Sequence, residues 1–376
     1  MQKSHIFHPR PVAYEDLISH NILIHIPRTA GTFFNNCLRA NDLAVIDHIQ
    51  RFIDSSESIQ HTRIRHQLSN RSTWISGHVR YDTLTRIFRP EENTRYFVLL
   101  RNPVNQLISQ INWQAETLCG SYLSLARMPL YQFRILMHVC LEALNRPQNV
   151  PNVLNRYFGS FLNNQCRSLS LMNSGRLRTD DLNLFSARCH ARLLELDGFS
   201  VESGINPFIK AVISEIQGNN HTQMIPPRSA QNRSHPVLDN DLVSSEEFRL
   251  EIFNLQLADY ILYQNAIGIL NGEQSPRRWQ NFNELKHDCE ELIVVQKSLE
   301  VVSNEKLVLK TRSRTKKLFF TAKVIRLIAK RLVALQKFSL FRQAFSWCKR
   351  LPASCRSLPL KAVSLTVLNR WNGRKC

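Results

Sequence analysis

The segment Arg28-Thr-Ala-Gly-Thr32 has the residue types of an anion-binding turn. It follows the apolar run Asn21–Ile26 and Pro27, and the residues from Phe33 to Ala40 have helical spacing. A small-residue turn at a helix N-terminus presents backbone N–H groups and the positive end of the helix dipole to an anion. The Walker A pattern is absent, and an ordinary strand–turn–helix unit is an equally good interpretation of this segment alone.

Two further polar clusters each follow a predicted strand. His78 comes shortly after strand 73–76, and an imidazole accepts protons near neutral pH. Arg101 follows strand 95–100, and Ser109 lies about two turns along the next helix. A guanidinium offers paired donors to a phosphate. Because the carboxyl ends of parallel strands meet in one crevice, we expect all three clusters to share one site.

The elements that must position these residues alternate along the chain. Strands are predicted at 21–26, 43–46, 73–76, 95–100 and 198–202. Helices are predicted at 33–40, 81–88, 104–114, 206–216 and 245–270, with further helical segments near 130–145, 151–163 and 180–196. This alternation predicts an α/β fold with a central parallel sheet flanked by helices.

Charge divides the chain of 376 residues into a nearly neutral body and a polycationic end. Residues 301–376 contain 19 of the 49 Lys and Arg residues but one acidic residue. We therefore predict an α/β domain at 1–270, a linker at 271–282 and a basic helical, possible coiled-coil extension at 283–376. Through residues 305–350 this extension is suited to an anionic membrane surface or an acidic partner, and a helical bundle packed on the body is the alternative. Nucleic acid ranks below these partners because no DNA- or RNA-binding motif is present.

The cysteines and the apolar segments indicate the cellular compartment of the protein. The nine cysteines show no CxxC pair and no zinc-type spacing, which favours a reducing compartment, although a Cys119–Cys166 or Cys166–Cys189 disulfide stays open. The N-terminus has no apolar signal-type region, and no apolar run is long enough to span a bilayer. We therefore predict a bacterial-type cytoplasmic protein, with peripheral membrane attachment through its basic end as an alternative.

The three clusters together resemble a family. Ile26-Pro-Arg-Thr-Ala-Gly-Thr-Phe33 is similar to the 5′-phosphosulfate loop of carbohydrate-type sulfotransferases. Phe97-Val-Leu-Leu-Arg-Asn-Pro-Val-Asn-Gln-Leu-Ile-Ser109 is similar to their 3′-phosphate motif. Ser76-Gly-His78 resembles the segment that supplies the catalytic histidine in the heparan sulfate 2-O-sulfotransferase branch. Weaker similarities occur at 201–202, 232–234 and 259–263, so the resemblance covers about residues 20–268.

The resemblance implies a three-layer, P-loop-like α/β fold related to nucleotide kinases. It also implies transfer of a sulfuryl group from 3′-phosphoadenosine 5′-phosphosulfate (PAPS), a cosubstrate, to a hydroxyl of a carbohydrate or glycan, without a metal. His78 would be the general base, and Arg28 would neutralise charge on the leaving group. Residues expected to bind the cosubstrate are Arg28, Thr29, Ala30, Gly31, Thr32, Phe33, Arg101, Ser109, Asn232 and Ser234; for the last two, a solvated loop is an equal alternative.

Two residues depart from the family pattern. Arg28 stands where the family usually has lysine, and arginine keeps the charge but does not release a proton. Asn102 stands where an acid is common. A catalytically weak relative that binds nucleotide or glycan is therefore an alternative function, and a membrane- or partner-binding protein acting through its basic end is another. His25, in the first predicted strand, is interpreted as a structural, hydrogen-bonded residue.

Overall fold

A computed structural model of the protein describes residues 5–7, 20–53, 73–88, 94–120, 146–157, 161–172, 176–217 and 240–293, with short pieces between 135 and 143 and residues 225 and 238. The described residues within 1–110, 154–233 and 243–295 form one compact unit, and those within 111–153 and 234–242 belong to a second. The sheet and every site residue that the structure describes lie in the first unit.

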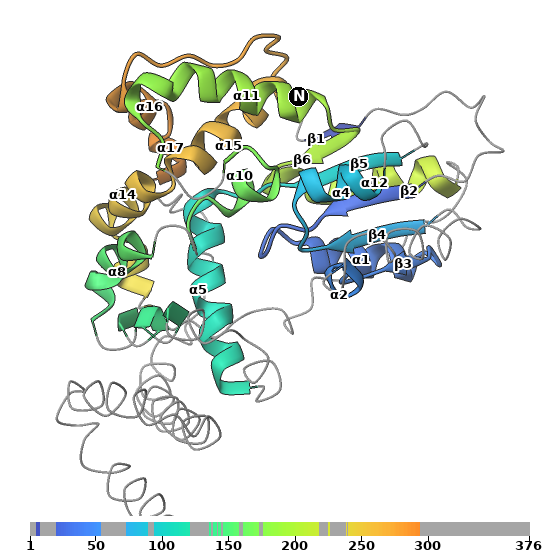
Figure 1. The fold of residues 1–376 in the computed structure, drawn as a ribbon, viewed down its shortest axis with the longest axis horizontal. Coiled ribbons are helices and arrows are strands. Elements are labelled where there is room, and N and C mark those ends of the chain that lie inside the picture. The colour runs from blue at the N-terminus through green and yellow to red at the C-terminus, as the bar shows by residue number, and fades with distance from the viewer. Residues whose placement is uncertain are drawn as a thin grey trace, which may run out of the picture. The chain divides into compact units, whose positions relative to one another are not determined.

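Six strands of the described part of the chain form one sheet, in the order β1-β6-β5-β2-β4-β3 (Figure 1). The five strands from β2 onward run parallel to their neighbours, whereas β1 pairs antiparallel with β6 at the edge. Their bounds are β1 (His5–Phe7), β2 (His20–Ile24), β3 (Val45–Ile46), β4 (Thr73–Gly77), β5 (Thr94–Leu99) and β6 (Gly198–Ser200). The predicted α/β class with a parallel, helix-flanked sheet is thus confirmed, while β1 lies in a segment that the sequence pattern assigned to no element.

The order of the strands fixes where a ligand crevice can form. From β2 the chain proceeds to β3 on one side of the sheet, and from β5 it proceeds to β6 on the other side. Loops that leave two adjacent strands in opposite directions open a crevice at the carboxyl ends of those strands. In this sheet that position lies between β2 and β5, which are hydrogen-bonded neighbours.

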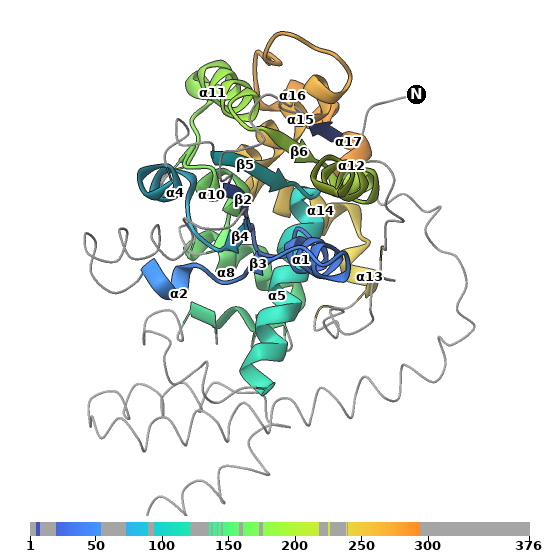
Figure 2. The same cartoon turned by 90° about the vertical axis from the view of Figure 1, so that its right-hand side faces the viewer.

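Helices cover both faces of the sheet. α1 and α12 lie side by side over one face, and α4 lies over the other (Figure 2). Alternate residues of β5 explain this, since Phe97 packs in the core beneath α1 and α12 while Tyr96 contacts Tyr81 of α4 with ring centres 5.3 Å apart. The helices are α1 (Gly31–Ala40), α2 (Gln50–Ile53), α4 (Tyr81–Ile87), α5 (Pro103–Gly120), α8 (Val150–Arg156), α10 (Asn164–Ser168), α11 (Leu182–Leu194), α12 (Ile205–Gln217), α13 (Asn240–Val243), α14 (Glu246–Leu255), α15 (Leu257–Leu270), α16 (Phe282–Asp288) and α17 (Glu290–Ile293).

The single helix predicted over 245–270 is wrong, because Gln256 divides it into α14 and α15. Gln256 is fully buried, and its side-chain oxygen accepts the backbone N–H of Asn163. No proline or glycine marks this break; a tertiary hydrogen bond accompanies it. After the break, α15 runs through the core with apolar residues on all sides, so it lacks the one-sided pattern of a surface helix.

Residues 277–293, which the sequence analysis placed in the linker and at the start of the extension, belong to the first unit. Trp279 is buried and donates from Nε1 to Asp288. α17 ends near the start of α5, where the Asn102 amide donates to the carbonyl of Leu292 over 2.9 Å. The extension from 294 onward lies outside the described residues.

Two further observations concern the cysteine pairs and the apolar character of the helices. Cys166 and Cys189 are buried free thiols, so the disulfide left open between them is not formed; the side chain of Cys119 lies outside the described residues. Of the helices that the structure describes, none combines the length and the apolar character that a bilayer-spanning helix requires.

Candidate active site

The turn after β2 has an unusual backbone. Arg28 and Ala30 both have positive φ values, of 68° and 73°, which side-chain-bearing residues seldom adopt. Thr29 between them is buried, and its hydroxyl donates to the carbonyl of Ile26 over 3.0 Å. Left-handed residues in a turn cost energy and cluster at functional sites, and they turn successive backbone N–H groups toward a common point. The backbone therefore supports the assignment of this turn as an anion-binding loop.

The helices that follow β2 and β5, α1 and α5, differ in how their first turns are capped. Asn102 caps α5, because its Oδ1 accepts the N–H groups of Val104 and Asn105 at 3.1 and 3.3 Å. The residue before α1, Ala30, supplies no side-chain cap. The first turn of α1 therefore offers its N–H groups and the positive end of its dipole to an anion. Asn102 stands where the resembled family commonly has an acid. A carboxylate there could also cap α5, but it could not donate a hydrogen bond to the carbonyl of Leu292.

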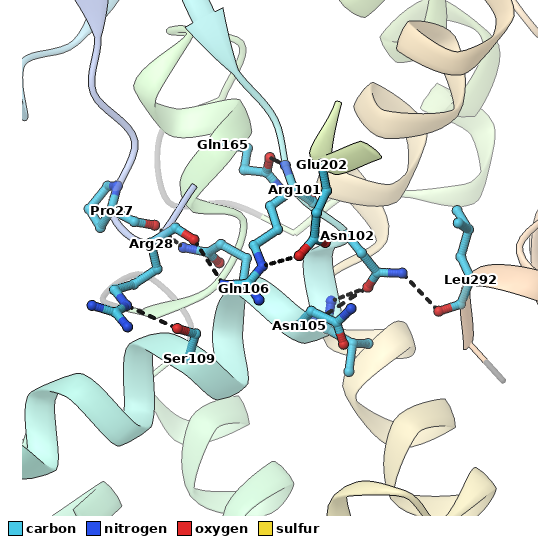
Figure 3. Close-up of polar contacts among 11 residues, drawn as sticks. Pro27, Arg28, Arg101, Asn102, Asn105, Gln106, Ser109, Gln165, Glu202 and Leu292 are labelled. Carbon is cyan, nitrogen blue, oxygen red and sulfur yellow. Dashed lines mark hydrogen bonds and ion pairs between the residues drawn. The ribbon is translucent and has the colours of Figure 1, made fainter. Parts of the chain in front are cut away.

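Contacts from residues 100–109, at the end of β5 and the start of α5 (the β5–α5 corner), hold the turn after β2 in place (Figure 3). The Arg28 side chain donates from Nε to the Ser109 hydroxyl over 2.9 Å. Arg101 donates from Nη1 to the backbone carbonyl of Arg28 over 3.2 Å, and Gln106 donates to that of Pro27 over 2.8 Å. The structure thus brings Arg28, Arg101 and Ser109 together. In this arrangement the hydroxyl of Ser109 is paired with Arg28, whereas the sequence analysis grouped it with Arg101.

Gln165 and Glu202 hold Arg101 in position. Gln165 of α10 accepts the Arg101 N–H at 3.0 Å and donates to its carbonyl at 2.8 Å. Glu202 binds the guanidinium through Nε at 3.0 Å. The buried Asp259 accepts the N–H groups of Gln165 and Cys166, which fixes the start of α10. Burial raises the pKa of Asp259 to about 6, although the two N–H donors favour its ionised form.

His78 follows β4 and is exposed at the same edge of the sheet. Its Nδ1 lies 2.6 Å from the carbonyl oxygen of His25. Since a carbonyl can only accept, Nδ1 carries the proton and Nε2 of the neutral ring carries the lone pair. Partial desolvation of the ring lowers the pKa of His78. The hydrogen bond to the His25 carbonyl opposes this shift, and a positive charge on His48 would add to it. His78 is therefore suited to accept a proton through Nε2 at neutral pH.

His25 contacts both His78 and the start of α1 after the β2 turn. Its buried ring contacts that of His78, with ring centres 4.4 Å apart and ring planes inclined by 42°. On its other side it touches Gly31, where a side-chain Cβ would lie only 2.2 Å from the ring. Burial lowers the pKa of His25 to about 3, so the ring is neutral in the physiological range. The prediction that His25 is structural agrees with these contacts.

The remaining predicted residues have varied positions. Thr32 is exposed and Phe33 half-buried in the first turn of α1. Asn232 and Ser234 lie outside the described residues. Sequence reasoning missed Gln106 and Gln165 and named Glu202 only in a weak similarity. Among these three residues, only Glu202 has a sequence signal, its position at the end of the last predicted strand. Within the described residues, no group of three or more His, Cys, Asp and Glu side chains is arranged to hold a metal ion.

Searches of protein-family models, curated proteins and solved structures found no match for this chain. The site combines an uncapped helix start, two arginines in contact and a histidine with its lone pair on Nε2.

Proposed function

We propose that the protein is a sulfotransferase that moves a sulfuryl group from PAPS to a hydroxyl of a carbohydrate or glycan. One observation carries the proposal. The turn after β2 and the β5–α5 corner, which resemble the two phosphate motifs of one family, meet through Arg28–Ser109 and Arg101–Arg28 contacts. Two anion-binding segments that touch suit a donor with two phosphate groups.

The proposed fold is the three-layer, P-loop-like form that the resemblance implies. Helices on both faces of a parallel sheet support it. So does an anion-binding turn directly after β2, the strand beside the crevice. In this proposal the first turn of α1 holds the 5′-phosphate and Arg101 reaches the 3′-phosphate.

The chemistry follows from where the charges and the proton acceptor lie. The acceptor oxygen attacks sulfur in line, and its proton passes to Nε2 of His78. The bond from sulfur to the 5′-phosphate oxygen breaks, and its electron pair stays on that phosphate. Arg28 and the N–H groups of α1 stabilise the charge that develops there. Proximity and electrostatics supply the catalysis, as in phosphoryl transfer.

Arg28 favours a second candidate, a relative that binds the nucleotide but transfers sulfate weakly. An arginine stabilises a leaving phosphate through charge and hydrogen bonds but does not give it a proton. In this structure Ser109 engages its Nε, so part of its donor capacity is already used. The roles predicted for the basic extension stay predictions, because that segment lies outside the described residues.

Turnover separates the two candidates. Purified protein, radiolabelled PAPS and a panel of glycans are incubated, and label is counted in the glycan fraction. The sulfotransferase proposal expects label with the wild type and its loss with His78→Ala. Binding without any transfer would leave the nucleotide-binding candidate.

Donor recognition has a separate test in thermal stabilisation by 3′-phosphoadenosine 5′-phosphate (PAP) and by AMP. The two ligands differ by the 3′-phosphate, so we expect PAP to raise the melting temperature more than AMP does. Arg101→Gln should remove most of this difference while keeping the response to AMP. Equal responses of the wild type to both ligands would contradict the 3′-phosphate role of Arg101.

A further inference from the structure

A second histidine lies at the same edge of the sheet, after β3. His48 is half-buried and has a positive φ of 59°. Its N–H is held by the Asp47 carboxylate over 2.9 Å. The centre of its ring lies 6.1 Å from that of His78, with the ring planes inclined by 58°. The short edge strand β3 thus places the imidazole of His48 beside His78, the proposed base.

Hydrogen bonds fix the position of the proton on His48. The backbone N–H of His78 donates to Oε1 of Gln50 over 3.1 Å, which settles the orientation of that amide. The Gln50 NH₂ group then faces Nδ1 of His48 at 3.2 Å and must be the donor. Nδ1 of His48 is therefore an acceptor, and the neutral ring carries its proton on Nε2. His78 has the opposite arrangement, with its lone pair on Nε2.

The backbone is shaped to admit this network. The N–H of Ile49 pairs with the carbonyl of Ser76 over 3.1 Å, which draws the start of α2 against the end of β4. At Gly77 a Cβ would lie 2.6 Å from the Ile49 side chain and 2.7 Å from Oε1 of Gln50. Only a residue without a side chain lets the Gln50 amide reach both histidines. Gly77 thus serves the pairing of His48 and His78.

We propose that His48 is a substrate-binding residue that donates from Nε2–H to a second oxygen of the acceptor, next to the hydroxyl whose proton His78 accepts. This inference rests on the proposed function. Two hydrogen bonds of about 2.9 Å to neighbouring oxygens can span the gap between the rings. The pair would favour an acceptor with vicinal oxygens, such as a sugar diol, over an isolated alcohol. His48 forms no covalent bond and gives up no proton in the transfer.

The tautomers are tested first, by long-range proton–nitrogen correlation spectra of the full chain labelled with nitrogen-15 histidine. His48→Phe and His78→Gln assign the two rings by loss of their signals. The exposed His287 serves as an internal reference for a ring outside the network. We expect a proton on Nε2 of His48 and on Nδ1 of His78. In Gln50→Glu a carboxylate faces Nδ1 of His48, so that nitrogen should gain a proton. A wild-type His48 protonated on Nδ1 would overturn the proposal.

Substrate binding is tested in the same spectra with cyclohexane-1,2-diol and cyclohexanol as probes, in the presence of PAP. The diol should perturb Nε2 of His48 and Nε2 of His78, whereas the alcohol should perturb His78 alone. His48→Phe should weaken diol binding about tenfold, the worth of one hydrogen bond, and leave alcohol binding unchanged. Equal effects of the two probes on His48, or none from either, would overturn the assignment. Failure of PAP to bind, with the tautomers as expected, would count against the proposed function instead.

Discussion

Gly31→Ala gives a direct test of the link between the anion-binding turn and the base. The added Cβ would lie 2.2 Å from Cδ2 and 2.5 Å from Nε2 of His25. Ordinary van der Waals contact needs more than 3.4 Å, so a shift of about 1 Å is required. The His25 ring is buried and in contact with the His78 ring, so a shift of His25 should also disturb His78. The substitution should therefore disturb the start of α1 and the base together.

The expected magnitude is that of an overpacked core, a loss of about 1–3 kcal/mol in the free energy of unfolding. Because the first turn of α1 is the proposed phosphate site, we expect PAP affinity to fall at least about tenfold, equivalent to about 1.4 kcal/mol. Urea unfolding measures the first quantity, and isothermal titration calorimetry with PAP measures the second. The nitrogen-15 signals of His78 should also shift, which a purely local effect on the turn would not cause.

Gly272→Ala is the matched control. Gly272 has a φ of +92°, and a Cβ there would meet nothing within 4 Å. The variant should lose about 1 kcal/mol of stability through backbone strain, with PAP affinity unchanged. If Gly31→Ala kept wild-type stability and affinity, the close packing of His25 under the turn would be refuted. If both variants lost PAP affinity equally, the loss would reflect general destabilisation.

Three further predictions concern individual side chains. Arg28→Lys should raise kcat for sulfate transfer because an ammonium can protonate the leaving phosphate, and an unchanged kcat would show that the loop cation acts through charge alone. The pKa of His78 is lowered from 6.5, so kcat/KM should fall only as the pH drops below 6.5; a midpoint above that value would contradict His78 as the base. Burial raises the pKa of Asp259 from 3.8 to about 6, so its folded state holds the proton more tightly. Relative to Asp259→Asn, the wild type should therefore lose about 3 kcal/mol of stability as the pH rises between these two values, measured by urea unfolding; parallel curves would refute the shift.

Local sequence patterns were sufficient to predict most strands of the sheet. The apolar run before Pro27 became β2 and the run before Arg101 became β5, because strands buried on both faces are continuously apolar. The helices predicted to start at 33 and 104 begin at 31 and 103, after the small-residue turn and at Pro103. The break at Gln256 could not be predicted, since it coincides with a hydrogen bond to Asn163, which is far away in sequence.

For the site, residue type and order alone predicted the loop, Arg101 and His78, because each follows an apolar strand and carries a chemically distinctive group, and they predicted Ser109 from its place in the helix after Arg101. The pairing of these groups was decided only by the tertiary structure. Ser109 lies against Arg28 because α5 passes beside the turn, and Glu202 reaches Arg101 because β6 lies next to β5. His48 carries no motif of its own, and it adjoins His78 because β3 pairs with β4. Strand order is a property of long-range packing, so it assigns partners that the sequence pattern leaves unspecified.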